Sequence, residues 1–309
     1  MQSDTALPKI SIITPSFNQA RYLEQTIRSV LEQNYPNLEY MILDGGSTDG
    51  SVEIIRRYAD QLAYWEGERD RGQAHAINKG LAHATGDLVA WLNSDDVYLP
   101  GALDAVGRAY AAYPNHIVAG SVINVWETTG RQKAIRQNLT LDAMMRFWSK
   151  EWLWHQPGIF IPRKVWQQVG FLDEGLHYGL DYDLMLRLLP LVPVQVIEQP
   201  LVRFRVHDEA KGGGERFDLF LSEWSLALHR HCPNLTQEDK KAHDAYMADR
   251  LALLIGQRLR KRDLRAARRA WHCARGAGVA SRTCAAFIGH WAAWLAVRIQ
   301  NSPSLQNKA

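Results

Sequence analysis

Two adjacent carboxylates, Asp95 and Asp96, follow a continuous apolar run at residues 88–92 that is preceded by Gly86. A short apolar run of this kind predicts a buried strand in a parallel sheet that is covered on both faces. Because two carboxylates cannot stay buried and unpaired, we expect them at the carboxyl edge of the sheet. Open α/β folds bind their ligands at this edge.

The chemistry that these two side chains favour is cation binding. Two carboxylates in one crevice repel each other unless a cation or a hydrogen-bonded ligand joins them. Hard oxygen ligands suit Mg²⁺ or Mn²⁺ carrying a diphosphate. On this stretch alone, a solvated turn in which Asp95 or Asp96 caps a helix fits equally well. The rest of the chain must decide between the two.

The elements before this site alternate between strand and helix patterns. Strand-like runs cover residues 10–14 and 38–43, and helical spacing follows each of them, at residues 22–31 and 51–58. This order predicts a parallel sheet with right-handed crossovers, whose first strand should stop at Pro15. The glycine-rich turn follows the second strand instead of the first, which argues against a dinucleotide-binding dehydrogenase.

Other polar residues fall on the same predicted edge. Asp44 ends the second strand, where it would accept a hydrogen bond from a base or a ribose hydroxyl, or form an Asx turn with the glycines that follow. Arg71 and Lys79 could face phosphates, although isolated cations are more commonly solvated at the surface.

Composition limits the class of protein. The 309 residues suffice for one large domain, or for one domain with an appendage. The three cysteines have no metal-binding spacing and indicate a reducing compartment, and the N-terminus lacks the features of a signal peptide.

The net charge of +3 conceals an asymmetry. Residues 240–309 contain 14 Lys or Arg and 3 Asp or Glu, whereas residues 1–239 contain 22 and 30. This distribution indicates a basic appendage on an acidic body, facing an anionic surface.

Two long blocks of the chain resemble family 2 inverting glycosyltransferases: residues 11–51, which end in LDGGSTDGS, and residues 70–96, from DRGQAHAINKG to LNSDD. The likeness extends over about residues 8–210. It implies an α/β fold of the GT-A type, in which a nucleotide-binding βα half is joined to an acceptor-binding half. We therefore expect a catalytic domain at residues 1–215 and a basic helical region at residues 216–309.

The resemblance also implies which residues hold a nucleotide-sugar, for which we expect UDP as the nucleotide. They are Pro15, Ser16, Asn18, Asp44, Asp70, Arg71, Gly72, Lys79, Ser94 and Asp95. Residues 93–96 correspond to the D-x-D element of the family, so Mg²⁺ or Mn²⁺ would rest on Asp95, with Asp96 and His207 as further ligands. For His207, the alternative is an ordinary loop histidine.

Matching GLDYDLMLRL to the family pattern places the general base at Asp181, and Leu180 stands where many relatives have Glu. The alternative is that Asp181 only caps a helix. Before Gln156, the residues Trp148, Trp152, Trp154 and His155 crowd together. We assign Trp154, His155 and Gln156 to acceptor binding, because aromatic faces stack on sugar rings; a core role for them is equally compatible with the sequence.

The segment after His207 contains Lys211 and a glycine run at residues 212–214. We expect this loop to order over the diphosphate, with Lys211 near the charge of the leaving group.

From Phe217 onward the chain has a helical pattern. Residues 257–275 combine Arg and Lys with an apolar stripe, and the apolar run at residues 283–297 is too short to span a membrane comfortably. A basic amphipathic helix with tryptophan suits a membrane surface. The alternative is a helical cap on the catalytic body, and no nucleic-acid partner is expected.

These observations together predict a metal-dependent inverting transferase. It would move a sugar from a nucleotide-sugar to a glycan or lipid-linked acceptor, as in bacterial surface polysaccharide assembly, in the cytoplasm and peripherally on the inner face of the membrane. A nucleotidyltransferase would need a basic glycine-rich loop after the first strand, which residues 16–20 do not supply. A catalytically silent nucleotide-sugar-binding or membrane-scaffold protein is disfavoured by the four carboxylates Asp44, Asp95, Asp96 and Asp181.

Overall fold

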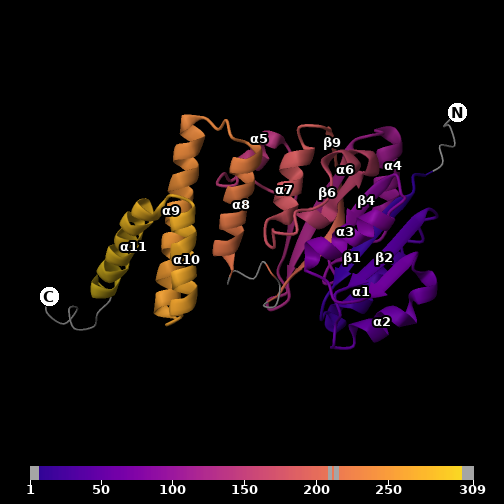
Figure 1. The fold of residues 1–309 in the computed structure, drawn as a ribbon, viewed down its shortest axis with the longest axis horizontal. Helices are drawn as coiled ribbons and strands as arrows, with labels where there is room; N and C mark the ends of the chain where they lie inside the picture. The colour runs from indigo at the N-terminus through magenta and orange to yellow at the C-terminus, as the bar shows by residue number, and fades with distance from the viewer. Residues whose placement is uncertain (1–6, 208–210, 212–215, 301–309) are drawn as a thin grey trace. The chain divides into compact units, whose positions relative to one another are not determined.

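The computed structural model describes residues 7–207, residue 211 and residues 216–300, with side chains as far as Ala293. Contacts divide the chain into two compact units, residues 1–213 and residues 214–309. We call the first the sheet unit and the second the helical unit (Figure 1).

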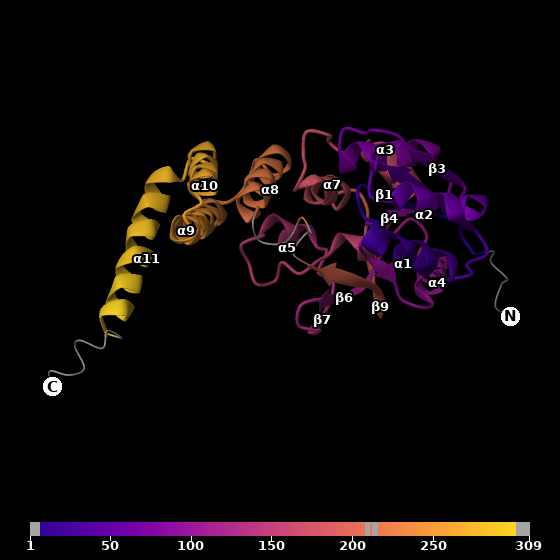
Figure 2. The ribbon, with the colours of Figure 1, turned by 90° about the horizontal axis from the view of Figure 1, so that it is seen from below.

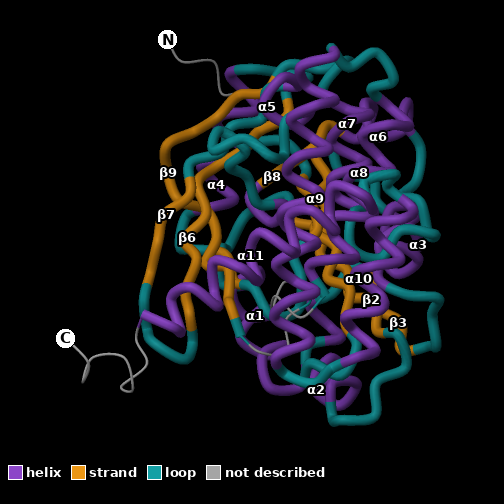
Figure 3. The backbone as a smooth tube through the Cα atoms, turned by 90° about the vertical axis from the view of Figure 1, so that its left-hand side faces the viewer, coloured by secondary structure: helices purple, strands orange, loops and turns teal. Residues whose placement is uncertain are grey.

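In the described part of the sheet unit, nine strands form one sheet in the order β3-β2-β1-β4-β8-β6-β9-β5, with β7 paired to β6. The strands are β1 (Ile10–Ser16), β2 (Leu38–Asp44), β3 (Tyr64–Gly67), β4 (Leu88–Trp91), β5 (Val97–Tyr98), β6 (Ile117–Trp126), β7 (Gln132–Ile135), β8 (Ile159–Pro162) and β9 (Val194–Val206). Strands β1 to β4 run parallel, and β8 joins them to the ribbon of β6, β7 and β9 that Figure 3 shows. This mixed sheet confirms the predicted α/β fold.

Helices cover both faces of the parallel strands (Figure 2). Helices α1 (Ala20–Leu31), α2 (Ser51–Arg57) and α4 (Ala102–Ala112) share one hydrophobic core with the sheet, and α3 (Gln73–His83) lies on the opposite face. The buried residues of α1 recur at helical spacing: Tyr22, Leu23, Thr26, Ile27 and Val30. This spacing places them on a single face, so α1 is held firmly against the strands whose ends carry Asp44 and Asp95.

The first strand is longer than the sequence pattern predicted. β1 continues through Pro15 to Ser16, pairing with β2 as far as the Ser16–Asp44 register. Its other neighbour, β4, pairs with it only as far as Ile13. A proline is tolerated there because this part of β1 has a strand on one side only. Pro15 and Ser16 therefore belong to the edge of the sheet that bears the candidate site.

The remaining helices of the sheet unit are α5 (Leu141–Met145), α6 (Arg163–Val169) and α7 (Leu180–Leu188). The helical unit contains α8 (Phe217–His231), α9 (Gln237–Arg260), α10 (Leu264–Gly276) and α11 (Ala280–Gln300). The start of α8 at Phe217 confirms the helical pattern predicted from that residue onward.

The predicted amphipathic helix at residues 257–275 is wrong, because the chain breaks inside it. α9 ends at Arg260, Arg262 adopts a left-handed backbone with φ of 59°, and Asp263 caps α10 by accepting a hydrogen bond from the amide of Ala266 at 3.0 Å. Aspartate is a favoured N-cap residue, and this preference prevails over the continuous stripe.

The apolar side of α10 lies inside the helical unit. Ala266, Ala267, Ala270 and Ala274 are buried, and α10 contacts α9 and α8. None of the described helices is both long enough and apolar enough to cross a membrane. On α11, Ile288 and Trp291 are exposed, and the side chain of Trp294 lies outside the described residues.

Candidate active site

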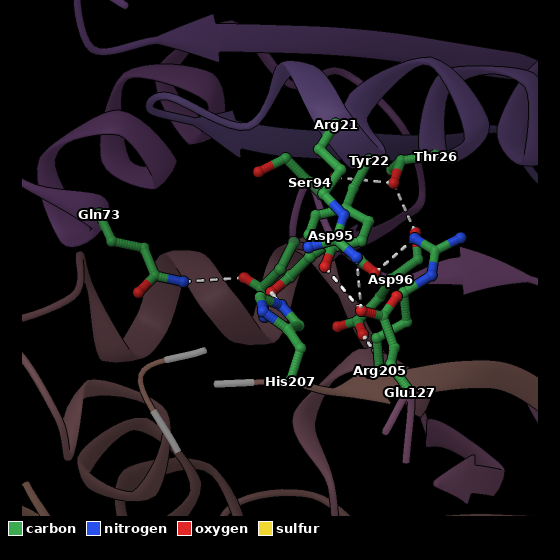
Figure 4. Close-up of polar contacts among 11 residues, drawn as sticks. Arg21, Tyr22, Thr26, Gln73, Ser94, Asp95, Asp96, Glu127, Arg205 and His207 are labelled. Carbon is green, nitrogen blue, oxygen red and sulfur yellow. Dashed lines mark hydrogen bonds and ion pairs between the residues drawn. The ribbon is translucent and has the colours of Figure 1, made fainter. Parts of the chain in front are cut away.

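The loop that carries Asp95 and Asp96 leaves β4 at the carboxyl edge of the sheet and is anchored by α1. The hydroxyl of Thr26, which is fully buried, donates to the backbone carbonyls of Ser94 at 2.9 Å and Asp96 at 2.7 Å (Figure 4). A shared hydroxyl donor fixes the turn at both ends, so the orientation of the Asp95 side chain is set by the packing of α1 on the sheet.

β9 ends beside this loop and brings His207 to Asp95. The Nε2 atom of His207 lies 3.1 Å from Oδ2 of Asp95, and the ring of Tyr22 lies against the imidazole with centroids 4.8 Å apart. The side chain of Asp95 remains 20% exposed, whereas that of His207 is almost entirely buried. The structure thus joins two of the three predicted metal ligands at one accessible point.

Arg205 holds β9 against the Asp95 loop. Its backbone amide donates to Oδ1 of Asp96 at 3.1 Å, and its guanidinium donates to the carbonyl of Asp95 at 2.7 Å and to the side chain of Gln25. The guanidinium also lies over the ring of Tyr22, 5.2 Å from its centroid. Arg205 therefore positions the loop that carries Asp95 and Asp96 against β9.

Asp96, the third predicted ligand, is wholly buried. Burial, followed by the neighbouring charge of Asp95, raises the pKa of the Asp96 carboxyl well above its usual range. Its Oδ1 atom accepts the hydrogen bond from the backbone amide of Arg205, so Asp96 anchors the loop to β9.

The described residues include no group of three or more His, Cys, Asp or Glu side chains that could hold a metal ion. The pair of Asp95 and His207 nevertheless fits a cation that is only partly held by protein. Two adjacent ligands of an octahedral ion, each about 2.1 Å from the metal, lie about 3.0 Å apart. The observed spacing of 3.1 Å matches that value, and the remaining ligands would come from phosphate and water.

The loops after β1 and β2 are tied to each other beside this pair. Asp44, 1% exposed, accepts hydrogen bonds from the amides of Gly46 at 3.1 Å and Ser47 at 2.7 Å and from the hydroxyl of Ser47 at 2.7 Å. The side-chain oxygen of Asn18 accepts a hydrogen bond from the backbone amide of Thr48 at 2.9 Å, and the backbone amide of Asn18 donates to the hydroxyl of Ser47. Asp44 therefore forms the Asx turn that the sequence left as one of two alternatives.

The segment from Asp70 to Gly72 adjoins the β2 loop. The amide of Gly72, whose φ is 122°, donates to Asp70 at 2.8 Å. A Cβ atom at Gly45 would lie 2.7 Å from the Asp70 carboxylate, so only glycine permits this approach.

The two predicted phosphate-binding cations are paired with carboxylates of the protein. Arg71 contacts Glu174 at 2.6 Å, and Lys79 forms an ion pair with Glu66. These are the structural roles that isolated surface cations commonly take.

Three segments meet at Gln73, the first residue of α3. Its side-chain nitrogen donates to Oδ1 of Asn93 at 2.8 Å, and its side-chain oxygen accepts from Nζ of Lys211 at 2.7 Å. Lys211 also donates to the carbonyl of His177, at 3.1 Å. Gln73 thus connects the Asp95 loop with the segment that leads into α7. The glycine run at residues 212–214 lies outside the described residues.

Asp181 is the second residue of α7, whose N-cap is Gly179. The alternative interpretation of Asp181 as the N-cap is therefore wrong; its Oδ1 atom accepts from the adjacent amide of Tyr182, at 2.8 Å. The neighbouring Asp183 is buried and pairs with Arg187 at 3.0 Å. Two carboxylates of one helical turn thus differ in surroundings, and Asp181 is the more exposed of them.

The three predicted acceptor residues are largely packed within the protein. Trp154 is 9% exposed, and the buried amide of Gln156 donates to the carbonyl of Trp91 at 2.9 Å. The ring of His155 lies against that of Phe204, with centroids 4.9 Å apart and the planes tilted by 33°, and burial lowers the pKa of the His155 imidazole to about 4. Such contacts are those expected if the three residues belong to the protein core, which is the alternative to acceptor binding that the sequence left open.

Four residues near the site were not assigned from the sequence: Phe17, Tyr22, Gln73 and Arg205. Phe17, in the loop after β1, is 60% exposed, and an aromatic side chain among polar loop residues is a signal that could have identified it. The other three occupy ordinary helix and strand positions and carry no such signal.

Comparison with known proteins extends this description. The profile of Glycosyl transferase family 2 matches residues 11–171. An uncharacterized glycosyltransferase of Rickettsia typhi is 28% identical over 219 residues, which are 67% of each chain, and one of Mycobacterium tuberculosis H37Rv is 37% identical over 123 residues, 40% of this chain and 45% of that protein. The chain spans only 39% of a similar protein of Rickettsia felis.

Among solved structures, S. aureus TarS in complex with UDP-GlcNAc aligns with a TM-score of 0.59 at 14% sequence identity, covering 84% of this chain and 89% of that one. TarS in complex with UDP aligns with a TM-score of 0.57 at 15% identity. At this identity the likeness shows the fold, which is a GT-A-like sheet followed by helices.

Proposed function

The chain belongs to glycosyl transferase family 2, and we propose that it transfers a sugar, with inversion, from a UDP-sugar to a hydroxyl of a glycan or lipid-linked acceptor. The observation that carries this proposal is the meeting of Asp95 and His207 at the carboxyl edge of the sheet, beside the loops of β1 and β2. The TarS structures that contain UDP-GlcNAc and UDP support a UDP-sugar as the donor.

The nucleotide would lie against the linked loops after β1 and β2. Phe17, exposed in the first of these loops, offers a face on which a nucleobase can stack. Pro15, Ser16, Asn18 and Asp44 give this part of the site its shape. The turn at Asp70 and Gly72 borders it on the side of α3.

Asp95 and His207 would hold the divalent cation. The cation, when bound, neutralises the charge that develops on the departing UDP. A nitrogen ligand favours Mn²⁺ over Mg²⁺, because transition ions bind imidazole more readily than Mg²⁺ does. Arg205 and Thr26 hold the backbone of the loop that carries Asp95 in place. Lys211, which reaches Gln73, would supply a further positive charge beside the leaving group.

Asp181 would accept the proton from the acceptor hydroxyl as its oxygen attacks the anomeric carbon. The attack and the departure of UDP occur in one displacement, so the configuration at that carbon inverts and no residue of the protein need form a covalent bond. Pairing of Asp183 with Arg187 occupies the other acid of this turn and leaves the role of base to Asp181.

We further propose that residues 1–215 are the catalytic domain and that the protein works in the cytoplasm, peripherally on the inner face of the membrane, in surface polysaccharide assembly. A lipid-linked acceptor would be presented there. The positive balance of residues 240–309 supports this location.

The test is a panel of UDP-, GDP- and ADP-sugars incubated with the protein and Mn²⁺, with release of the free nucleoside diphosphate as the readout. We expect release from one or more UDP-sugars and from neither of the other classes. Binding of UDP-sugars without any release, with water or with sugar alcohols and lipid-linked glycans as acceptors, would indicate a silent binding protein and contradict the proposal.

A further inference from the structure

The outward side of α10 is basic over its whole length. Six exposed or half-buried residues lie on it: Leu264, Arg265, Arg268, Trp271, His272 and Arg275. They recur at the spacing of one helical face, opposite the buried alanines. The preceding turn adds the exposed cations Arg260, Lys261 and Arg262. We call these nine residues the α10 basic face.

The orientation of this face is fixed by contacts within the helical unit. The alanine side of α10 is buried, and Arg269, at the flank of the helix, pairs with the buried Asp218 of α8 at 2.6 Å. Arg269 is therefore occupied within the unit, whereas the cations of the α10 basic face have no carboxylate partner among the described residues.

Negative charge is nearly absent from this part of the chain. From residue 250 to the end, Asp263 is the sole acidic residue. Its carboxylate accepts the hydrogen bond from the amide of Ala266 that caps α10. Six cations of the α10 basic face thus present their charge to whatever approaches this face.

Apolar side chains are mixed with these cations. Leu264 is 68% exposed, and Leu259, one residue before the turn, is 38% exposed. Binding to an acidic groove or to a phosphate backbone needs only cations. Binding to a lipid surface is strengthened both by cations and by apolar side chains that insert into it. A symmetric contact between this face and the same face of a second copy would oppose cations with cations.

We propose that the α10 basic face docks the protein on an anionic lipid bilayer. Charge attracts the face to the headgroups, and Leu259 and Leu264 enter the boundary between headgroups and acyl chains. The biological reason for such docking, access to a lipid-linked acceptor, rests on the proposed function; the docking itself depends only on the helical unit.

The test is co-sedimentation of the full-length protein with vesicles of phosphatidylcholine and phosphatidylglycerol at 3:1, and with phosphatidylcholine alone, in about 0.1 M salt. Arg265→Gln/Arg268→Gln should weaken binding to the anionic vesicles by about 25-fold, because each cation near such a surface contributes about fivefold. The matched control is Lys240→Gln/Lys241→Gln, which removes the same charge at the other end of α9, about 29 Å along the helix from Arg260. In 0.1 M salt its binding should stay within about twofold of the wild type, because this distance exceeds the Debye length of about 10 Å.

Leu264→Ser separates lipid docking from simple charge attraction. The wild type should retain part of its binding at high salt, and Leu264→Ser should lose that part. Absence of binding to anionic vesicles, equal losses in the two double variants, or binding to RNA in its place would overturn the proposal. Release of UDP from UDP-sugars, measured on the same preparations without vesicles, tests the proposed function separately. An active protein that ignores vesicles would refute only the docking.

Discussion

Glu39 of β2 offers a quantitative test of how the strands below the site are held together. Its buried carboxylate accepts hydrogen bonds from Lys9 at 2.6 Å, Ser11 at 2.5 Å and Thr85, whose amide donates at 2.8 Å and hydroxyl at 2.6 Å. These bonds connect β1, β2 and the segment between α3 and β4. Burial by itself raises the pKa of Glu39, but the hydrogen bonds outweigh it and lower the pKa from 4.5 to about 2.

A lowered pKa means that the folded state favours the ionised carboxylate. The stabilisation is fully present above the ordinary pKa of 4.5 and is lost as the pH falls towards 2. The shift corresponds to about 3 kcal/mol at pH 7 and to roughly half of that at pH 3. Glu39→Gln removes the charge at similar volume. We therefore expect it to lower the free energy of unfolding by about 3 kcal/mol at pH 7 and by clearly less at pH 3.

Urea unfolding at pH 7 and pH 3, followed by tryptophan fluorescence, measures this difference. Glu53→Gln is the matched control, because the Glu53 side chain is 70% exposed, and it should change the free energy of unfolding by less than about 0.5 kcal/mol at either pH. A loss in Glu39→Gln that is the same at both pH values, or no loss at pH 7, would refute the assignment of a stabilised carboxylate.

Three further predictions concern the site and the helical unit. Asp181→Asn should lower turnover by about 10²-fold or more while UDP affinity, measured by calorimetry, stays unchanged; loss of affinity with turnover retained would point to a structural residue. Phe17→Ala should weaken UDP binding by about tenfold or more and Phe17→Tyr should restore it, if the ring stacks on the base. Burial lowers the pKa of His243, so the folded helical unit favours the neutral imidazole and should lose stability as the pH falls below 6.5. Urea unfolding at pH 7 and pH 5 should show this loss of stability for the wild type and not for His243→Gln.

Much of the sheet could be predicted from the sequence, because the signals are local. The apolar run before Asp95 contains β4, and the strand-like run at residues 38–43 lies within β2. Local signals failed where a neighbouring element decides the outcome. The extension of β1 past Pro15 depends on β4 ending early, and the break after Arg260 depends on capping by Asp263.

In the candidate site, too, local sequence signals mark some residues, whereas others depend on the packing of distant elements. Asp95 and Asp181 are assigned from their position in motifs, whereas the contact between Asp95 and His207 joins residues 112 positions apart and requires β9 to lie in its observed register. Arg205 and Tyr22 support this contact, but nothing in a strand arginine or a helical tyrosine marks such a role. Whether Trp154 faces a sugar or the core likewise depends on tertiary packing.

The central claim is that Asp95 binds a divalent cation that the transfer reaction requires. The direct measurement is the rate of UDP release from a UDP-sugar by metal-stripped protein before and after addition of Mn²⁺, for the wild type, Asp95→Asn and the control Asp104→Asn on α4. We expect Mn²⁺ to restore release in the wild type and the control but not in Asp95→Asn. Release by Asp95→Asn at the wild-type rate, or wild-type release unaffected by Mn²⁺, would contradict the claim.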